Sequence, residues 1–281
     1  MYFRKLGLAV AFSPRAQAML AEAVRLKHLF QSGLVLIHVG NHSKDEEEIM
    51  VKLLTKAGIK EDEVTICWRQ GKPAEQILRA CKEEDVDLLI TGALKKEGLV
   101  QHYLGSVARK ILRKSKCSVL TIINPSVQPK PFENIVTEVD ESEKVLDTLS
   151  VACTIAQQEK SKWLHIVREI KLYSLTMSTA GHVTETEYNR LKQSLVEDEI
   201  DYVQSMLNQI PHKEMKINIK VVTGKSGFEL AQFTKRKAAD LLIVSAPARR
   251  LSLLDRIFPH DLEYIFADLP CNLLIVNPSK A

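Results

Sequence analysis

Short apolar runs alternate with stretches of helical periodicity from the N-terminus onward. In the first part of the chain these runs cover residues 6–12, 34–39, 64–68, 88–92 and 118–123. Continuous runs of this length are typical of strands that are covered on both faces of a parallel sheet. Between them apolar residues recur at spacings of three and four, and Pro73 and Ser106 suit the first turns of two helices. The alternation predicts an α/β fold with right-handed crossovers and a doubly wound sheet.

The same pattern occurs twice along the chain. Two segments recur at an offset of 153 residues: Gly71-Lys72 as Gly224-Lys225, and Asp87-Leu88-Leu89-Ile90 as Asp240-Leu241-Leu242-Ile243. The apolar run after Cys117 is likewise echoed after Cys271. A repeat of this kind predicts two tandem copies of one five-stranded unit. Because bare sheet edges invite association, we expect the copies to pair through their last strands, residues 118–123 and 272–276.

The repeat also predicts the domain boundaries. It places a first domain at residues 1–126, a linker at 127–132 and a second domain at 133–281, and the prolines around the junction make the linker stiff. Val10 and Val139 are only 129 residues apart, so the second copy carries about 24 extra residues before the offset reaches 153. We place this insertion in the polar stretch at about residues 170–190, where a loop of this length is expected to be functional or partly disordered.

Composition and charge narrow the class of protein. The chain has 45% hydrophobic and 26% charged residues, the balance of a soluble globular protein. Its net charge of +4 is too small for a nucleic-acid surface, and no apolar stretch approaches the ~18 residues of a membrane span. The five cysteines are scattered without a CxxC pair, and the N-terminus lacks the features of a signal peptide. We therefore expect a cytoplasmic protein with buried thiols, no metal site, no nucleic-acid partner and no membrane contact.

The candidate site follows the fourth strand of the first copy. Ligands of doubly wound sheets bind at the carboxyl ends of the strands, where the strand order reverses. There the chain reads Gly92-Ala93-Leu94-Lys95, nine further residues, and then Gly105-Ser106-Val107 at the start of a helix. Glycine lets the backbone approach a ligand closely, and the free amides of a helix N-terminus favour phosphate.

This arrangement resembles the G-x2-G-x9-G-[S/T] nucleotide loop of the universal stress protein family. The first strand ends in Val10-Ala11-Phe12-Ser13-Pro14 where the family typically has Val-Asp-Gly-Ser-Pro, and the second strands close with His38-Val39 and His165-Ile166, as they often do in the family. The resemblance covers the chain apart from the insertion and implies ATP or a related nucleotide as the ligand. It implies phosphate contacts from Gly92, Gly105, Ser106 and Val107, and base and ribose contacts from Ala11, Phe12, Ser13 and Val39.

Both copies depart from the family pattern. In the first, Lys95 replaces the second motif glycine, where it would either fill the pocket or offer a cation to phosphate, and Ala11 replaces the aspartate that contacts adenosine in nucleotide-binding members. The second copy keeps Asp140 but has lost the motif glycines, with Ser245-Ala246-Pro247-Ala248 followed by Phe258-Pro259. Proline removes an amide donor where phosphate would need one, so we expect nucleotide in the first copy only.

Two functions fit these residues. No nucleophile or proton-transfer constellation accompanies the loop, so the resemblance implies a regulatory or stress-response protein that binds a ligand and catalyses at most a slow ATP hydrolysis. The alternative is an interaction module whose pockets are vestigial and which binds partners through its sheet edges or the insertion. In either case the intramolecular pairing of the copies leaves room for a homodimer.

Overall fold

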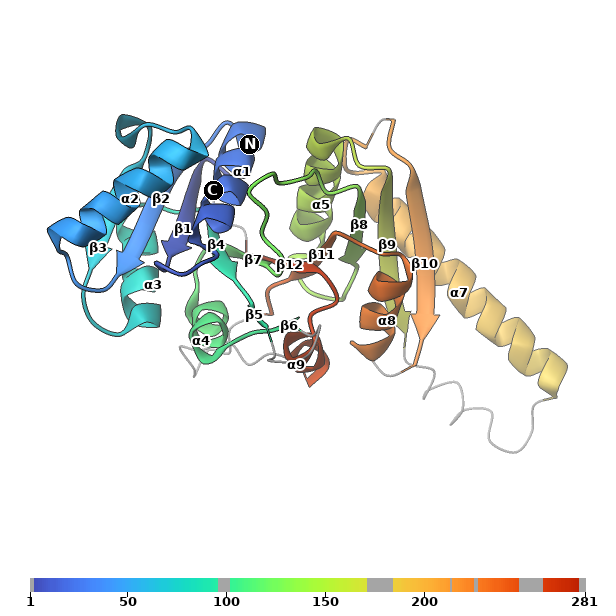
Figure 1. Cartoon of the computed structure of the whole chain (residues 1–281). Coiled ribbons are helices and arrows are strands. Elements are labelled where there is room, and N and C mark those ends of the chain that lie inside the picture. The colour runs from blue at the N-terminus through green and yellow to red at the C-terminus, as the bar shows by residue number, and fades with distance from the viewer. Residues whose placement is uncertain are drawn as a thin grey trace.

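A computed structural model of the chain describes residues 3–95, 102–170, 184–212, 214–224, 227–247 and 260–277. Strands and helices alternate through both halves, as the sequence predicts (Figure 1). The first half comprises β1 (Lys5–Val10), α1 (Ala16–Phe30), β2 (Gly33–Val39), α2 (Lys44–Ala57), the short 3-10 helix η1 (Glu61–Glu63), β3 (Thr65–Arg69), α3 (Pro73–Glu83), β4 (Leu88–Gly92), β5 (Leu94–Lys95), β6 (His102–Tyr103), α4 (Ser106–Lys114) and β7 (Ser118–Ile122).

The second half repeats this order without the small β5–β6 pair among its described residues. It comprises β8 (Asn134–Glu138), α5 (Val145–Glu159), β9 (Trp163–Ile170), α7 (Glu185–Leu207), β10 (Ile217–Thr223), α8 (Phe228–Arg236), β11 (Leu241–Ser245), α9 (His260–Ala267) and β12 (Asn272–Val276). The five strands predicted for the first half begin and end within two residues of β1, β2, β3, β4 and β7.

The two halves form one ten-stranded sheet. Its order is β10-β9-β8-β11-β12-β7-β4-β1-β2-β3. In the first half β2 and β3 lie on one side of β1, and β4 and β7 lie on the other. In the second half β9 and β10 lie on one side of β8, and β11 and β12 lie on the other, and the five strands of each half are parallel. At the centre β12 pairs antiparallel with β7, with Leu274 opposite Leu120. The expected pairing through the last strands is therefore confirmed. Because β7 and β12 pair with each other, neither is left as a bare edge strand.

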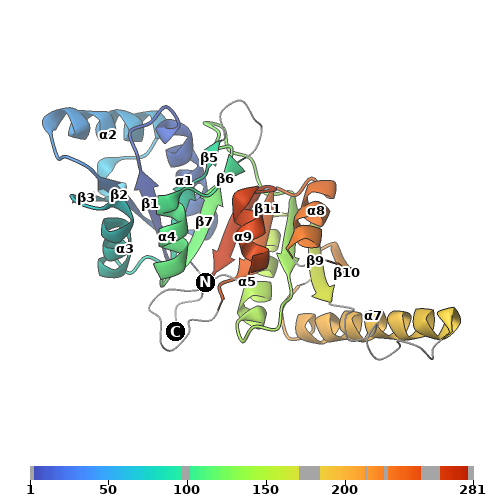
Figure 2. The same ribbon diagram turned by 90° about the horizontal axis from the view of Figure 1, so that it is seen from below.

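Helices cover both faces of the sheet. The helices α1, α2, α5 and α7 lie on one face, and α3, α4, α8 and α9 lie on the other (Figures 1 and 2). Each face buries a single apolar cluster to which both halves contribute, for example Leu36 with Ile166 on the first face and Leu89 with Leu242 on the second. The shared cores tie the halves together through apolar burial as well as through the sheet.

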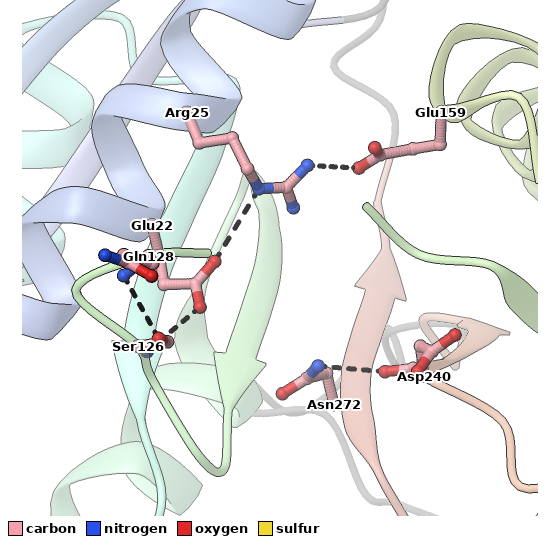
Figure 3. Close-up of polar contacts among 7 residues, drawn as sticks. All are labelled: Glu22, Arg25, Ser126, Gln128, Glu159, Asp240 and Asn272. Carbon is pink, nitrogen blue, oxygen red and sulfur yellow. Dashed lines mark hydrogen bonds and ion pairs between the residues drawn. The ribbon is translucent and has the colours of Figure 1, made fainter. Parts of the chain in front are cut away.

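Polar contacts lie on both faces of the sheet along the seam, the junction of the two halves where β7 pairs with β12. On the α1 side, Arg25 Nη1 lies 2.6 Å from Glu159 Oε1 of α5, and Glu22 accepts a hydrogen bond from the Ser126 amide (Figure 3). On the α4 side, Arg109 forms an ion pair with Glu263 of α9. Burial raises the pKa of Glu22, despite the opposing effects of the Ser126 amide and Arg25. The seam therefore holds a charge that the interior disfavours.

The expected linker and insertion differ in how far the structure describes them. Phe132, at the end of the linker range, is buried, and the Arg25 guanidinium lies 4.9 Å from its ring centroid. Residues 171–183 of the expected insertion lie outside the described residues. From Glu185 onward the chain is already in α7, which has 23 residues where α2 has 14, so this part of the predicted loop is helix.

Other sequence expectations concern thiols and membranes. All five cysteines are free and buried, as expected. Within the described ranges, the structure contains no helix with the length and apolar character needed to cross a membrane.

Candidate ligand-binding cleft

A cleft of about 640 Å³ opens at the carboxyl ends of β1 and β4. This is the point where the strand order reverses, because β2 lies on one side of β1 and β4 on the other. Eight of the nine residues expected at a ligand site line it: Ala11, Phe12, Ser13, Val39, Gly92, Gly105, Ser106 and Val107. A volume of this size suits a small organic ligand.

The N-terminus of α4 forms one wall of the cleft. Gly105 is the N-cap residue of α4, and no side chain caps this helix. The first backbone amides of α4, at the cleft, therefore have no capping side chain as a hydrogen-bond acceptor. Val107 is 41% exposed, whereas Ala108, Ile111 and Leu112 are the buried residues of this helix. Val107 therefore lies at the cleft wall and not on the buried face of α4.

The two glycines differ in how crowded their surroundings are. A Cβ added at Gly92 would lie 3.6 Å from Met19 Sδ, an ordinary contact. A Cβ added at Gly105 would lie 2.6 Å from Leu94 Cδ1, because the Leu94 side chain leans over this position. Neither glycine has a positive φ. Gly105 therefore provides room near the helix N-terminus, and a large side chain there would displace Leu94 or fill the cleft.

Lys95 is the expected site residue that does not line the cleft. It lies exposed on β5, where it pairs with His102 of β6. Burial and then the charges of Arg15 and Lys95 lower the pKa of His102. The β5–β6 pair therefore keeps Lys95 outside the cleft, beside an imidazole whose protonated form is disfavoured.

Arg15 is a cleft residue that the sequence motifs do not reveal. Its Nη1 donates to the carbonyl oxygen of Ala93 at 2.9 Å, and its Nη2 donates to that of Ile123. The guanidinium thus bridges the ends of β4 and β7 and lines the cleft. None of the described lining residues is acidic, and the described part of the chain gives Arg15 no carboxylate within ion-pair distance. The cleft therefore favours an anionic ligand.

Phe12 and His38, which line the cleft, belong to an aromatic cluster with Trp68. The Phe12 ring stacks on the His38 ring with centroids 4.2 Å apart, and the Trp68 ring lies 5.3 Å from that of His38. His38 Nδ1 is 3.1 Å from the Val10 carbonyl oxygen, so this nitrogen carries a proton that it donates. Phe12 therefore stands where the family has a small residue and adds an apolar wall.

The sheet register corrects one expected equivalence between the halves. Lys5 pairs with Gly33 in the first half and Asn134 with Trp163 in the second, so Arg168 is the counterpart of His38. His165 lies three residues earlier, in the middle of β9, and pairs with Val136. The expectation that His165 closes the second strand as His38 does was wrong.

The same register makes Glu169 the counterpart of Val39, which lines the cleft of the first half. The Glu169 carboxylate accepts hydrogen bonds from the amides of Gly227 and Leu230, at distances of 3.0 to 3.2 Å, at the start of α8. A carboxylate at this position satisfies helix amides and repels a second anion. In the first half the apolar Val39 leaves the equivalent space uncharged.

The strand-one aspartate of the second half is also engaged internally. Asp140 Oδ1 accepts a hydrogen bond from the Ser142 amide at 3.0 Å and from Ser245 Oγ at 3.5 Å. Ser245 Oγ in turn lies 3.0 Å from Thr148 Oγ1. The expected blocking residues Phe258 and Pro259 lie outside the described residues, as does Ala248. In the part of the chain that the structure describes, no group of three potential metal ligands comes together.

Comparisons with known proteins agree with this architecture. Residues 2–122 match the sequence profile of the Universal stress protein family. Universal stress protein YxiE of Bacillus subtilis is 27% identical over 146 residues, which are 43% of this chain and 99% of that protein. Among solved structures, the functionally unknown protein PA1789 of Pseudomonas aeruginosa matches with a TM-score of 0.67 and 16% identity, over 99% of this chain and 93% of its own.

Two further solved proteins bear the family name. A universal stress protein of Archaeoglobus fulgidus matches with a TM-score of 0.63 and 13% identity, over 98% of each chain. A universal stress protein solved in complex with cAMP covers 45% of this chain and 100% of its own, at 18% identity and a TM-score of 0.36. YxiE thus aligns over nearly all of its own length with about half of this chain, whereas the Archaeoglobus fulgidus structure matches the whole chain. Residues 2–122 thus match the universal stress protein family, and the whole chain shares the fold of a longer solved protein that bears the family's name.

Proposed function

We propose that the first half binds an adenine nucleotide in the cleft between β1 and β4, and that the second half serves as a non-binding partner half. The observation that carries the proposal is the gathering of eight motif residues around one cleft, where Arg15 is the cation and the described lining contains no acid. The phosphates would lie at the uncapped N-terminus of α4, near Gly105 and Ser106.

The base and ribose would lie toward the other wall. Ala11, Phe12, Ser13 and Val39 form that side of the cleft, and Phe12 offers a flat ring that already stacks on His38. Because Ala11 supplies no carboxylate for the ribose, binding would be weaker by about tenfold or more than with the full family motif. This role is regulatory, in a reducing cytoplasm, without catalysis beyond a slow hydrolysis of ATP.

The proposed inactivity of the second half rests on Glu169 and Asp140. Both carboxylates already accept hydrogen bonds from backbone amides of their own half, and Glu169 places a negative charge at the start of α8, the counterpart of α3, whose first residues line the cleft of the first half. The second half then contributes β12, α5 and α9 to the seam. It acts as the intramolecular counterpart of a second subunit.

The test is the nucleotide content of the purified chain. Protein prepared without added ligand is denatured, and released nucleotides are identified by chromatography and mass spectrometry, for wild type, Gly105→Phe and Arg15→Ala. We expect an adenine nucleotide from the wild type and none from Gly105→Phe. Samples that stay empty even after equilibration with millimolar ATP would favour the interaction module with vestigial pockets.

A further inference from the structure

A second cleft lies at the opposite edge of the first half. It has a volume of about 780 Å³ and opens beside the start of β1 and the residues that precede β4 and β7. Two cysteines line it: Cys81, in the last turn of α3, and Cys117, immediately before β7. Each residue is buried, with 6% of its surface exposed, and forms part of the cleft wall.

The two thiols are in contact with each other. The Cys81 thiol is hydrogen-bonded to the Cys117 sulfur, and Ser115 Oγ lies 3.2 Å from Cys117 Sγ. This contact raises the pKa of Cys81, which donates, and lowers the pKa of Cys117, which accepts. Cys117 is therefore the more easily ionised sulfur, and Cys81 is the adjacent one.

The rim of the cleft is strongly basic. Its cationic residues come from β1 and its approach, from α3, from α4 and from the turn after α4: Arg4, Lys5, Arg79, Lys82, Lys114 and Lys116. Only Asp85 and Asp87 oppose them among the described lining residues, and Asp87 Oδ2 already accepts the amides of Arg4 and Lys5. The cleft thus attracts a small molecule that carries carboxylates.

We propose that Cys81 and Cys117 form a thiol–disulfide exchange site, which takes a small anionic disulfide from the basic cleft and converts it to two thiols. The Cys117 thiolate attacks one sulfur of the disulfide, whose S–S bond breaks and releases one thiolate. Cys81 then loses its proton and attacks the Cys117 sulfur, which releases the second thiolate. The protein gains one Cys81–Cys117 disulfide, and its two thiol protons pass to the two released thiolates.

The second half supplies a matched control within the same chain. Cys271 precedes β12 as Cys117 precedes β7, but Thr234 stands in α8 where Cys81 stands in α3. Thr234 Oγ1 donates to the Leu230 carbonyl oxygen, and Cys271 Sγ donates to its neighbour's carbonyl. Burial, then the charge of Asp240, raises the pKa of Cys271, so this thiol should stay reduced.

The disulfide would join α3 to the start of β7. Pro73 and Ile77, in the first part of α3, line the ligand cleft at the other edge of the sheet. Oxidation would therefore fix the helix that forms one wall of that cleft. Transient disulfides of this kind are the form in which cytosolic proteins sense redox state.

The experiment uses the full chain, fully reduced and then incubated with oxidised glutathione as the anionic probe or with bis(2-hydroxyethyl) disulfide as the neutral one. After quenching, free thiols are alkylated under denaturing conditions and peptides are mapped by mass spectrometry. We expect a Cys81–Cys117 cross-link that dithiothreitol reverses, with Cys67, Cys153 and Cys271 alkylated. We also expect oxidised glutathione to react about tenfold faster than the neutral probe at low salt. In Cys81→Ala, Cys117 should accumulate as a mixed disulfide with glutathione.

Three results would overturn the proposal. The first is that all five cysteines remain alkylated after prolonged incubation. The second is a cross-link that joins Cys81 to Cys67, whose charge also reaches Cys81. The third is equal reaction rates with the charged and the neutral probe, which would remove the role of the basic rim. Nucleotide binding does not enter any of these measurements.

Discussion

His38 and Arg168 occupy the same position in the two halves, and each donates a hydrogen bond to a backbone carbonyl oxygen at the end of its half's first strand, that of Val10 or of Val139. The distances are 3.1 Å from His38 Nδ1 to Val10 O and 3.3 Å from Arg168 Nη1 to Val139 O. Around Arg168 the contacts are ion pairs, including one of 2.6 Å to Glu199. Around His38 they are the rings of Phe12 and Trp68 and the carboxylate of Glu46, 3.8 Å from His38 Nε2, and His38 lines the cleft of the first half.

Ala11 and Lys95 are the two departures from the family motif in the first half, and the structure separates their effects. Ala11 lines the cleft and Lys95 does not. We expect Ala11→Asp to tighten ATP binding by about tenfold, because it restores a charged hydrogen-bond acceptor. Lys95→Gly should leave affinity nearly unchanged. Fluorescence titration with a labelled ATP analogue measures both, and a larger gain from Lys95→Gly would contradict the assignment.

Val39 and its counterpart Glu169 suggest an exchange of side chains, beginning with Val39→Glu in the first half. Val39→Glu places a carboxylate in the cleft of the first half, where it should weaken ATP binding by more than tenfold through repulsion and occupation of the site. Val39→Gln is the matched control without the charge and should bind more tightly than Val39→Glu. Equal affinities of these two variants would argue against an anionic ligand.

In the second half the same exchange concerns stability. Glu169→Val removes the acceptor of the Gly227 and Leu230 amides. We expect the free energy of unfolding to fall by about 1 kcal/mol, the usual cost of a lost helix cap. Urea denaturation followed by circular dichroism would measure it. A variant as stable as the wild type would show that the carboxylate does not cap α8.

The seam pair Arg25–Glu159 should matter far more than an exposed pair of the same length. The N–O distance is 2.6 Å in Arg25–Glu159 and in Lys162–Glu133, but the Glu159 side chain is only 2% exposed and that of Glu133 is 51% exposed. Arg25→Ala leaves a buried charge without its partner and should cost about 3 kcal/mol. Lys162→Ala should cost less than about 1 kcal/mol. Similar losses of unfolding free energy in the two variants, measured by denaturant titration, would contradict the expected effect of burial.

The raised pKa of Glu22 predicts that the stability of the seam depends on pH. Burial raises its pKa in the folded chain, so folding favours its protonated form. Its contribution to stability is therefore complete below its ordinary pKa of about 4.5 and is lost as pH rises through the higher folded value. The unfolding free energy of Glu22→Gln, relative to wild type, should increase between pH 4 and pH 7. A difference that stays constant across this range would contradict the raised pKa.

The fold followed closely from the sequence, because short apolar runs and a repeated pattern specify buried parallel strands. The site followed less completely. Motif spacing located Gly92 and Gly105, but Lys95 left the cleft because residues around the loop pair as β5 and β6. The sequence did not predict Arg15 as a site residue, because only the tertiary structure brings its side chain to the ends of β4 and β7.

The error about His165 has a simple physical origin. A His followed by a β-branched residue occurs in both halves, but β9 extends five residues beyond His165. A strand's sequence does not reveal its register against its neighbours, and a shift of three residues places the side chain on the opposite face. The offset of 129 residues between Val10 and Val139 places the counterpart of His38 within one residue of Arg168, whereas His165 lies at an offset of 127.

The central claim is that one half of the chain binds nucleotide and the other does not. Isothermal titration calorimetry of the full-length protein with ATP tests it most directly, with Gly105→Phe as the variant and circular dichroism to verify that both are folded. The account predicts one site per chain in the wild type and no heat of binding in Gly105→Phe. Two sites per chain, or equal binding by the wild type and Gly105→Phe, would contradict it.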